Sequence, residues 1–193
     1  MTSTKAFLAF LLASAPLFAA THTYKIDPIE STVAWVGKKV TGQHNGTLKM
    51  KGGKVELDGT ALKSGEFVVD MTTLTVLDLT DADSNGKLTG HLKSDDFFSV
   101  DKNPTAKFTV KSVTEKGGVS RATGAMEIKG ISHDITIPLK IDVKAGAATI
   151  TGKASLDRTK WNIKFRSGKF YENLGDKLIY DSFDITFDLK AKP

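Results

Sequence analysis

The chain of 193 residues contains no cysteine, so no disulfide can stabilise it and its stability must come from packing alone. Beyond the first twenty residues, no stretch approaches the 18 consecutive apolar residues that a transmembrane helix needs. The net charge of +5 comes from lysines and arginines that are spread along the chain without a dense basic run. The sequence therefore predicts neither a transmembrane helix nor binding to nucleic acid.

Motifs that carry catalysis are also missing. The chain has no Gly-x-Ser-x-Gly elbow, no His-Glu-x-x-His and no phosphate-cradling glycine loop. Its four histidines do not form a pair at zinc-ligand spacing. Its carboxylates fall mostly on the polar faces of alternating segments, where they aid solubility. The sequence predicts a protein that is not an enzyme and that has no metal or other cofactor.

The first twenty residues have the layout of a secretory signal peptide. Lys5 precedes an apolar run from Ala6 to Leu12, and small residues follow up to Ala19 and Ala20. We expect cleavage near Ala20, which leaves residues 21–193 as one domain, exported to the periplasm or secreted from a bacterium.

Most of the remaining chain alternates between apolar and polar residues, the pattern of half-buried β-strands. The clearest segments are EFVVDM (66–71), AKFTVKS (106–112), DITIPLKIDV (134–143), WNIKFR (161–166) and FDITFDLK (183–190). Glycine-containing turns, expected for example at Asn45-Gly46 and Gly117-Gly118, would separate such runs. This predicts an all-β sandwich or closed barrel, in which Pro138 marks an edge-like position or a bulge.

One region, between Thr72 and Thr105, breaks the alternation. Leu88, His91 and Leu92 have helical spacing, and Ser84 or Asn85 is a candidate N-cap. We expect a short helical insertion at about residues 84–98. The start of this region, DADSNG (81–86), resembles a calcium loop, but the twelfth position, which needs a bidentate acid, is Leu92. A surface turn with a helix cap is the better interpretation.

Four ordered segments resemble the YceI-like family of exported proteins. They are YKIDPIESTVAWVGKKVTG (24–42), GHLKSDDFFSVDKNPTAKFTVKSV (90–113), GAMEIKGISHDITIPLKIDV (124–143) and ASLDRTKWNIKF (154–165), and FDITFDLKA resembles the family's closing strand. Two positions depart from the pattern of many members: Glu30 replaces a histidine, and Trp161-Asn162 replaces a Phe-Gly pair.

The resemblance implies an eight-stranded antiparallel barrel, lipocalin-like in shape, around an elongated apolar cavity. It also implies a hydrophobic small-molecule ligand: a polyisoprenoid, an isoprenoid quinone or a fatty-acid derivative. A two-fold homodimer is compatible with the resemblance. The protein is thus expected to sequester or carry a long amphiphilic lipid. The alternative is a packed barrel with a structural or stress-response role and no lipid ligand, because small residues facing large ones can also complete a solid core.

The candidate ligand-binding residues are the inward-facing side chains of the expected strands, together with neighbours from the helical insertion and the Asp-Arg motif. They are Trp35, Phe67, Val69, Met71, Phe97, Phe108, Val110, Gly124, Met126, Ile137, Leu139, Arg158, Trp161, Ile163, Phe165, Phe183 and Ile185. If Gly124 lies on the cavity wall, Gly124→Phe should block the ligand and leave the fold intact.

Polar groups would orient the head of such a ligand. Arg158 is suited to pair with a carboxylate or a quinone oxygen, and is equally suited to a structural ion pair near the rim. His91 is expected to bond a backbone carbonyl or to cap the ligand entrance, whereas His44 and His133 are expected to be solvated. An outer-membrane barrel is a third interpretation; the few aromatics, which form no girdles, and the continuous charge along whole strands argue against it.

Overall fold

A computed structural model describes residues 21–193, so the expected signal peptide lies outside the described residues. The strands are β1 (His22–Ile26), β2 (Thr32–Lys39), β3 (Gly42–Asp58), β4 (Ala61–Asp70), β5 (Thr105–Lys116), β6 (Val119–Ile128), β7 (Ile131–Lys144), β8 (Ala147–Asp157) and β9 (Ile179–Lys192). The helix α1 spans Ala82–Lys93, and the 3₁₀ turns are η1 (Met71–Thr73), η2 (Arg158–Trp161) and η3 (Gly175–Lys177).

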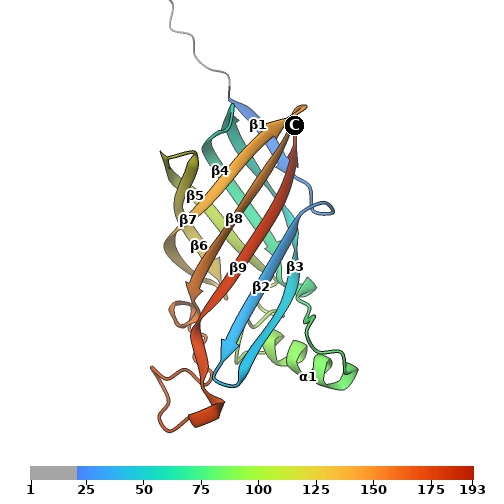
Figure 1. The fold of residues 1–193 in the computed structure, drawn as a ribbon, viewed down its shortest axis with the longest axis vertical. Helices are drawn as coiled ribbons and strands as arrows, with labels where there is room; N and C mark the ends of the chain where they lie inside the picture. Colours follow the sequence, from blue (N-terminus) through green and yellow to red (C-terminus); the bar gives the residue numbers. More distant parts are fainter. Residues whose placement is uncertain (1–20) are drawn as a thin grey trace, which may run out of the picture.

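Strands β2 to β9 form a closed antiparallel barrel (Figure 1). Each strand pairs with the next along the chain, and β2 closes the ring by pairing with β9. Strand β1 lies outside this ring of eight. It pairs with residues 54–57 of β3 and with the end of β9, beyond the point at which β2 stops pairing with these two strands. The expectation of an all-β, eight-stranded antiparallel barrel is thus confirmed.

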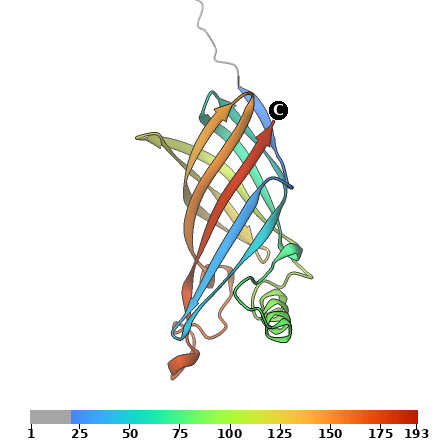
Figure 2. The ribbon, with the colours of Figure 1, turned by 45° about the vertical axis from the view of Figure 1, so that its right-hand side comes forward.

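The two ends of the barrel differ. At one end, here called the closed end, β1 and the C-terminus meet, and the interior is filled by fully buried side chains such as Val55, Leu57 and Ile150. At the other, the open end, lie α1, the tip of the β2–β3 hairpin and the loop 162–178 (Figures 1 and 2). The closed end supplies a packed core; the open end is built from insertions that surround the barrel interior.

The helical insertion is present, but its bounds differ from the expected ones. It begins after Asp81, whose side chain accepts a hydrogen bond from Ser84 N–H at 2.8 Å, and turns follow it from Asp95 to Phe98. Asp81 is therefore the N-cap, and the expected caps Ser84 and Asn85 are wrong. The Asn85 side chain donates instead to the carbonyls of Val76 and Leu79, fixing the segment before the helix.

The segment WNIKFR is not a strand, contrary to the prediction. Trp161 ends the η2 turn, and its buried indole donates to Met126 O at 3.2 Å. The β7–β8 ladder covers only Leu139–Lys144 of β7, and the η2 turn packs against β7 beyond that point, where His133 Nε2 lies 2.8 Å from Lys160 O. Pro138 sits where this ladder ends, so its missing N–H costs no pairing with β8.

Candidate functional site

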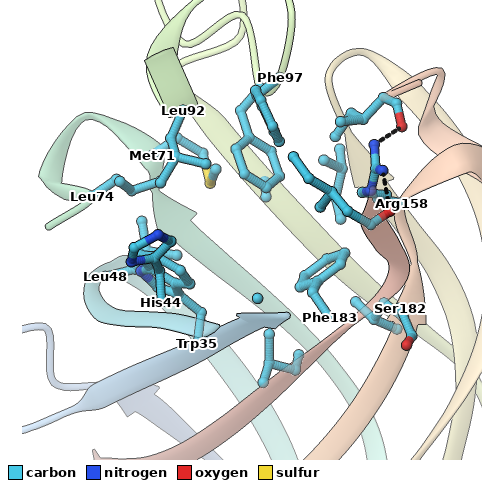
Figure 3. A pocket seen from close by; sticks show the side chains of 18 of the residues that line it. Trp35, His44, Leu48, Met71, Leu74, Leu92, Phe97, Arg158, Ser182 and Phe183 are labelled. Carbon is cyan, nitrogen blue, oxygen red and sulfur yellow. Dashed lines mark hydrogen bonds between the residues drawn. The ribbon is translucent and has the colours of Figure 1, made fainter. Parts of the chain in front are cut away.

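The interior of the barrel contains two cavities that follow one another along its axis. The larger, of about 170 Å³, reaches the open end, and the smaller, of about 70 Å³, lies deeper. They share the wall residues Val33, Val69, Ala106, Met126 and Ile185. Figure 3 shows the larger cavity between Trp35, Met71, Phe97 and Phe183. Together they form an apolar channel that enters at one end and stops against the packed core.

Most of the candidate ligand-binding residues line this channel. The larger cavity is bordered by Trp35, Val69, Met71, Phe97, Met126, Arg158, Ile163, Phe183 and Ile185, and the smaller one adds Phe67, Phe108, Ile137 and Leu139. The alternation of β4, β5, β7 and β9 thus placed these side chains on the correct face. Their contact with a ligand stays a prediction.

Four candidates, Val110, Gly124, Trp161 and Phe165, line neither cavity. A Cβ atom on Gly124 would lie 2.1 Å from Thr109 O, because β5 approaches β6 closely at a register shift after Val110. Gly124 is therefore a site of close strand packing, and the expectation that Gly124→Phe would leave the fold intact is wrong. Trp161 packs beside β7, and Phe165 packs on His91.

The sequence prediction missed two groups of wall residues at the open end, and it also missed further wall residues on β3, β5, β6, β8 and β9: Met50, Ala106, Lys107, Ile128, Leu156, Ile179, Tyr180, Ser182, Phe187 and Leu189. The β2–β3 hairpin contributes Val33, Gly37, Lys38, Lys39, His44 and Leu48, and the segment from Leu74 through α1 to Phe98 contributes Leu74, Leu88, Leu92 and Phe98. Part of the first group could have been predicted, because Val33, Trp35 and Gly37 stand at every second position and therefore share one face of a strand. The second group could not have been predicted from a sequence pattern, because its position over the barrel depends on long-range packing.

A contact between Trp35, Gly46 and Thr75 holds the segment after β4, residues 74–78, beside the cavity. They are paired across β2 and β3, and a Cβ on Gly46 would lie 2.8 Å from the indole and 1.8 Å from Thr75 O. The indole Nε1–H donates to that same carbonyl at 3.2 Å. Because only glycine at position 46 leaves this space, Trp35 can anchor residues 74–78 against the β2–β3 hairpin. Residues 74–78 also cover the free edge of β3, through hydrogen bonds that the N–H groups of Thr75 and Leu77 donate to β3 carbonyls.

The charged and titratable side chains that line the larger cavity are Lys38, Lys39, His44, Arg158 and Tyr180; among the described residues, no carboxylate lines it. Lys38 bonds Asp184 at 2.9 Å, and this contact lowers the pKa of the Asp184 carboxyl. His44 Nδ1 lies 2.7 Å from Asp78, so the expectation of a solvated His44 is wrong. Burial opposes ionisation of Asp78, but hydrogen bonds from Asn45 and His44 outweigh it and lower its pKa.

Arg158 has a structural role in this fold. It is only 4% exposed, and its Nε, Nη1 and Nη2 donate to the carbonyls of Tyr180, Ile163 and Ile179, at 3.1, 2.8 and 3.0 Å. These acceptors lie at the two ends of the loop 162–178, so the guanidinium holds the base of the loop together (Figure 3). Asp181 lies 3.5 Å away and completes the ion pair. A ligand contact by Arg158 stays a prediction.

Aromatic contacts join the two insertions that cover the open end. His91, on α1, packs edge-on against Phe97 at 5.0 Å and against Phe165, of the loop 162–178, at 4.6 Å between ring centroids. Its Nε2 lies 3.1 Å from Asp96, a carboxylate and not the expected backbone carbonyl. His91 therefore fixes α1 to the loop beside the cavity.

Two further findings concern the described residues. No helix within residues 21–193 is long and apolar enough to cross a membrane. Within the same range, no cluster of three His, Cys, Asp or Glu side chains is arranged to hold a metal ion.

The fold and the cavity define the class: a closed antiparallel β-barrel with an internal apolar channel. A model of the YceI-like domain matches residues 24–191. The chain therefore belongs to the YceI-like family, and the resemblance inferred from its motifs is confirmed.

Relatives show the same family along most of the chain. Protein YceI of Shigella flexneri is 28% identical over 159 residues, covering 81% of each chain, and a UPF0312 protein of Photorhabdus laumondii is 26% identical over 170 residues, covering 88% of this chain and 85% of its own. A UPF0312 protein of Shewanella denitrificans is 36% identical, but over only 44% of this chain and 42% of its own.

Solved structures share the fold at low identity. Burkholderia cenocepacia BcnA has a TM-score of 0.69 at 21% identity, covering 86% of this chain and 98% of its own. A polyisoprenoid binding domain from Saccharophagus degradans, implicated in plant cell wall breakdown, has a TM-score of 0.62 at 14% identity, covering 88% and 97%. At such identities these likenesses establish the architecture alone.

Proposed function

We propose that the protein is a periplasmic or secreted carrier that shields the tail of one long amphiphilic lipid inside its barrel. The observation that carries this proposal is the apolar channel, open at one end and closed by packed core at the other. The polyisoprenoid binding domain that shares the fold supports the same class of ligand. A barrel filled throughout by its own side chains, the alternative interpretation, would leave no such channel.

Burial of the tail supplies enough free energy for binding. Each CH₂ group transferred from water contributes about 0.8 kcal/mol, so twelve carbons contribute roughly 10 kcal/mol before the costs of ordering and association. Polar contacts are then needed only to orient the head group.

The mouth of the channel favours a head group that accepts hydrogen bonds. Lys38, Lys39 and His44 border it. Lys38 and His44 are paired with the carboxylates of Asp184 and Asp78, so among these three described residues Lys39 is the one without a carboxylate partner. Carboxylates, phosphates and quinone oxygens are acceptors that such donors recognise. The proposed ligands are therefore a polyisoprenoid or its phosphate, an isoprenoid quinone, or a fatty-acid derivative.

Native mass spectrometry of protein released from cells by osmotic shock tests this proposal. Solvent extraction and lipid mass analysis of the same sample should give one bound species with an isoprenoid or acyl mass. Recovery in the shock fluid would also support export. A clean apo mass, together with no uptake of added ubiquinone or fatty acid, would contradict the carrier function.

A further inference from the structure

Exposed apolar side chains gather around the open end of the barrel. Val40, Leu77, Phe170, Tyr171 and Tyr180 are 47–60% exposed, and we call these five residues the apolar rim. Within the described part of the chain, the other exposed large hydrophobic residues are Ile29, 94% exposed in the loop before β2, and Val119, 36% exposed at the start of β6. The rim is thus a local feature of the end at which the channel opens.

Backbone hydrogen bonds join the segments that carry the rim. Leu77 N–H donates to Asn45 O, on β3, at 2.9 Å. Val40 N–H, at the hairpin tip, donates to Leu178 O at 3.2 Å, and Ile179 N–H donates to Arg166 O at 3.0 Å. These bonds join the hairpin, the loop 162–178 and the start of β9, which lie together in Figure 2. Tyr180 belongs both to the rim and to the cavity wall, so the surface is continuous with the channel.

Basic side chains are interspersed with the rim. The loop 162–178 carries Lys164, Arg166, Lys169 and Lys177 against Glu172 and Asp176. Lys169 is ion-paired with Asp157 and Asp181, so the positive charge of this surface comes from Lys164, Arg166 and Lys177, together with Lys39 at the hairpin. Lys164 Nζ lies 4.8 Å from the ring centroid of Phe170, so charge and aromatic surface are adjacent. On the α1 side, by contrast, the acidic residues Asp83 and Asp95 are ion-paired with Lys87 and Lys102.

Exposed aromatics among lysines and arginines are the composition that binds the interface of a bilayer containing anionic lipid. We infer that the open end docks on such a bilayer through the hairpin and the loop 162–178. The lipid tail then passes between membrane and channel along Tyr180 without crossing water. The inference rests on the proposed carrier function, and it adds the surface with which the carrier exchanges its ligand.

Co-sedimentation of the exported protein with vesicles tests the docking surface. We expect binding to phosphatidylglycerol–phosphatidylethanolamine vesicles that is at least tenfold stronger than binding to phosphatidylcholine vesicles and weakens at high salt. The double variant F170S/Y171S should lose at least tenfold in partition coefficient, and K164Q/K177Q roughly tenfold. The matched controls I29S/V119S and K25Q/K116Q, which change exposed residues outside the rim, should bind like the wild type.

Ligand uptake from detergent micelles, measured in parallel, separates this inference from the carrier function. Phe170 and Tyr171 do not line the channel, so F170S/Y171S should take up ubiquinone from micelles normally. Two results would overturn the docking surface and leave the carrier function intact. In the first, the wild type takes up ligand but does not bind vesicles; in the second, the rim variants and the control variants lose vesicle binding equally. A wild-type dimer that F170S/Y171S dissociates, without vesicle binding, would assign the rim to a second copy instead. Vesicle binding without any ligand uptake would support docking and contradict the carrier.

Discussion

Arg158 Nη1 donates to the carbonyl of Ile163 at 2.8 Å, and this bond fixes the point at which the chain leaves the barrel wall. The same guanidinium bonds Ile179 O and Tyr180 O, where the chain returns as β9. One buried side chain thus sets both ends of the loop 162–178, which borders the mouth of the channel. The geometry of this loop accounts for the burial of Arg158, and a contact between Arg158 and a ligand stays a prediction.

Replacing Arg158 by lysine should therefore destabilise the protein. A lysine can bond one carbonyl but leaves the others buried without a donor, so we expect a loss of about 2–4 kcal/mol in the free energy of unfolding. Urea denaturation measures it, and R121K, at an exposed site on β6, should change stability by less than about 0.5 kcal/mol. An R158K protein as stable as the wild type would show that the three bonds contribute little.

Gly124 offers a test of close strand packing. Since a Cβ there would lie 2.1 Å from Thr109 O, Gly124→Ala should force β5 and β6 apart and cost about 2–4 kcal/mol. Gly90→Ala is the matched control: Gly90 is exposed on α1 with open space around it, and alanine favours helix, so stability should rise by about 0.5–1 kcal/mol. Thermal unfolding of both variants distinguishes them, and an unaltered G124A protein would contradict this role of Gly124.

Asp157 should make stability depend on pH in the acid range. Burial opposes its ionisation, but hydrogen bonds from Lys169 and Thr159 outweigh that and lower its pKa to about 2. An unfolded carboxyl titrates near 3.9, so the folded protein holds this proton less tightly. The carboxylate therefore stabilises the fold fully above about pH 5, and the contribution is lost as pH falls toward 2.

Comparison of the wild type with D157N isolates this contribution. The side chain is 30% exposed, so after solvent screening we expect a difference of roughly 1–2 kcal/mol at pH 7 that shrinks steadily below pH 4. Urea unfolding between pH 2.5 and 7 measures it, with D101N, in the exposed turn before β5, as control. A difference between D157N and wild type that stays constant over this range would show that the Asp157 carboxyl does not titrate with a lowered pKa.

The barrel was predictable from the sequence because its signals are local. Alternation places Phe67, Phe108 and Ile137 on the inward face of their strands, and Gly117-Gly118 forms the expected turn between β5 and β6. Asn45-Gly46, also expected as a turn, lies instead inside β3. The structure of the open end could not be predicted in the same way. Trp161 begins the six-residue alternating run 161–166, and such a short run is compatible with both a strand and a turn. Its position depends on where the β7–β8 ladder ends, which no local pattern encodes.

The cap of α1 shows the same limit on a smaller scale. Asp81, Ser84 and Asn85 are all competent N-caps by residue type. The helix begins after Asp81, whose carboxylate accepts from Ser84 N–H, and the Asn85 amide nitrogen donates to the carbonyls of Val76 and Leu79, a tertiary arrangement that residue type alone does not encode. Likewise, alternation predicts that Gly124 faces the cavity. Only the register shift in β5 shows that no space for a side chain is left at this position.

Ala106 should set the length of tail that the channel accepts. It lies in the wall shared by the two cavities, so a larger side chain there separates the deep cavity from the mouth. Along β9, the channel runs from Ile179 to Leu189, which at the usual strand rise and barrel tilt is about 25 Å. That length holds roughly 20 carbons of an extended chain at ordinary bond geometry.

Ala106→Leu should therefore weaken binding of a long tail at least tenfold and leave a tail of about half that length nearly unaffected, because only the long tail needs the deep cavity. Competition between fatty acids of the two lengths, in isothermal titration calorimetry, measures the ratio. The control Ala125→Leu changes a neighbouring strand, β6, at a position outside the cavity lining. Equal weakening of both tails in A106L would indicate a general loss of packing, whereas no change in either would mean that tails end in the larger cavity.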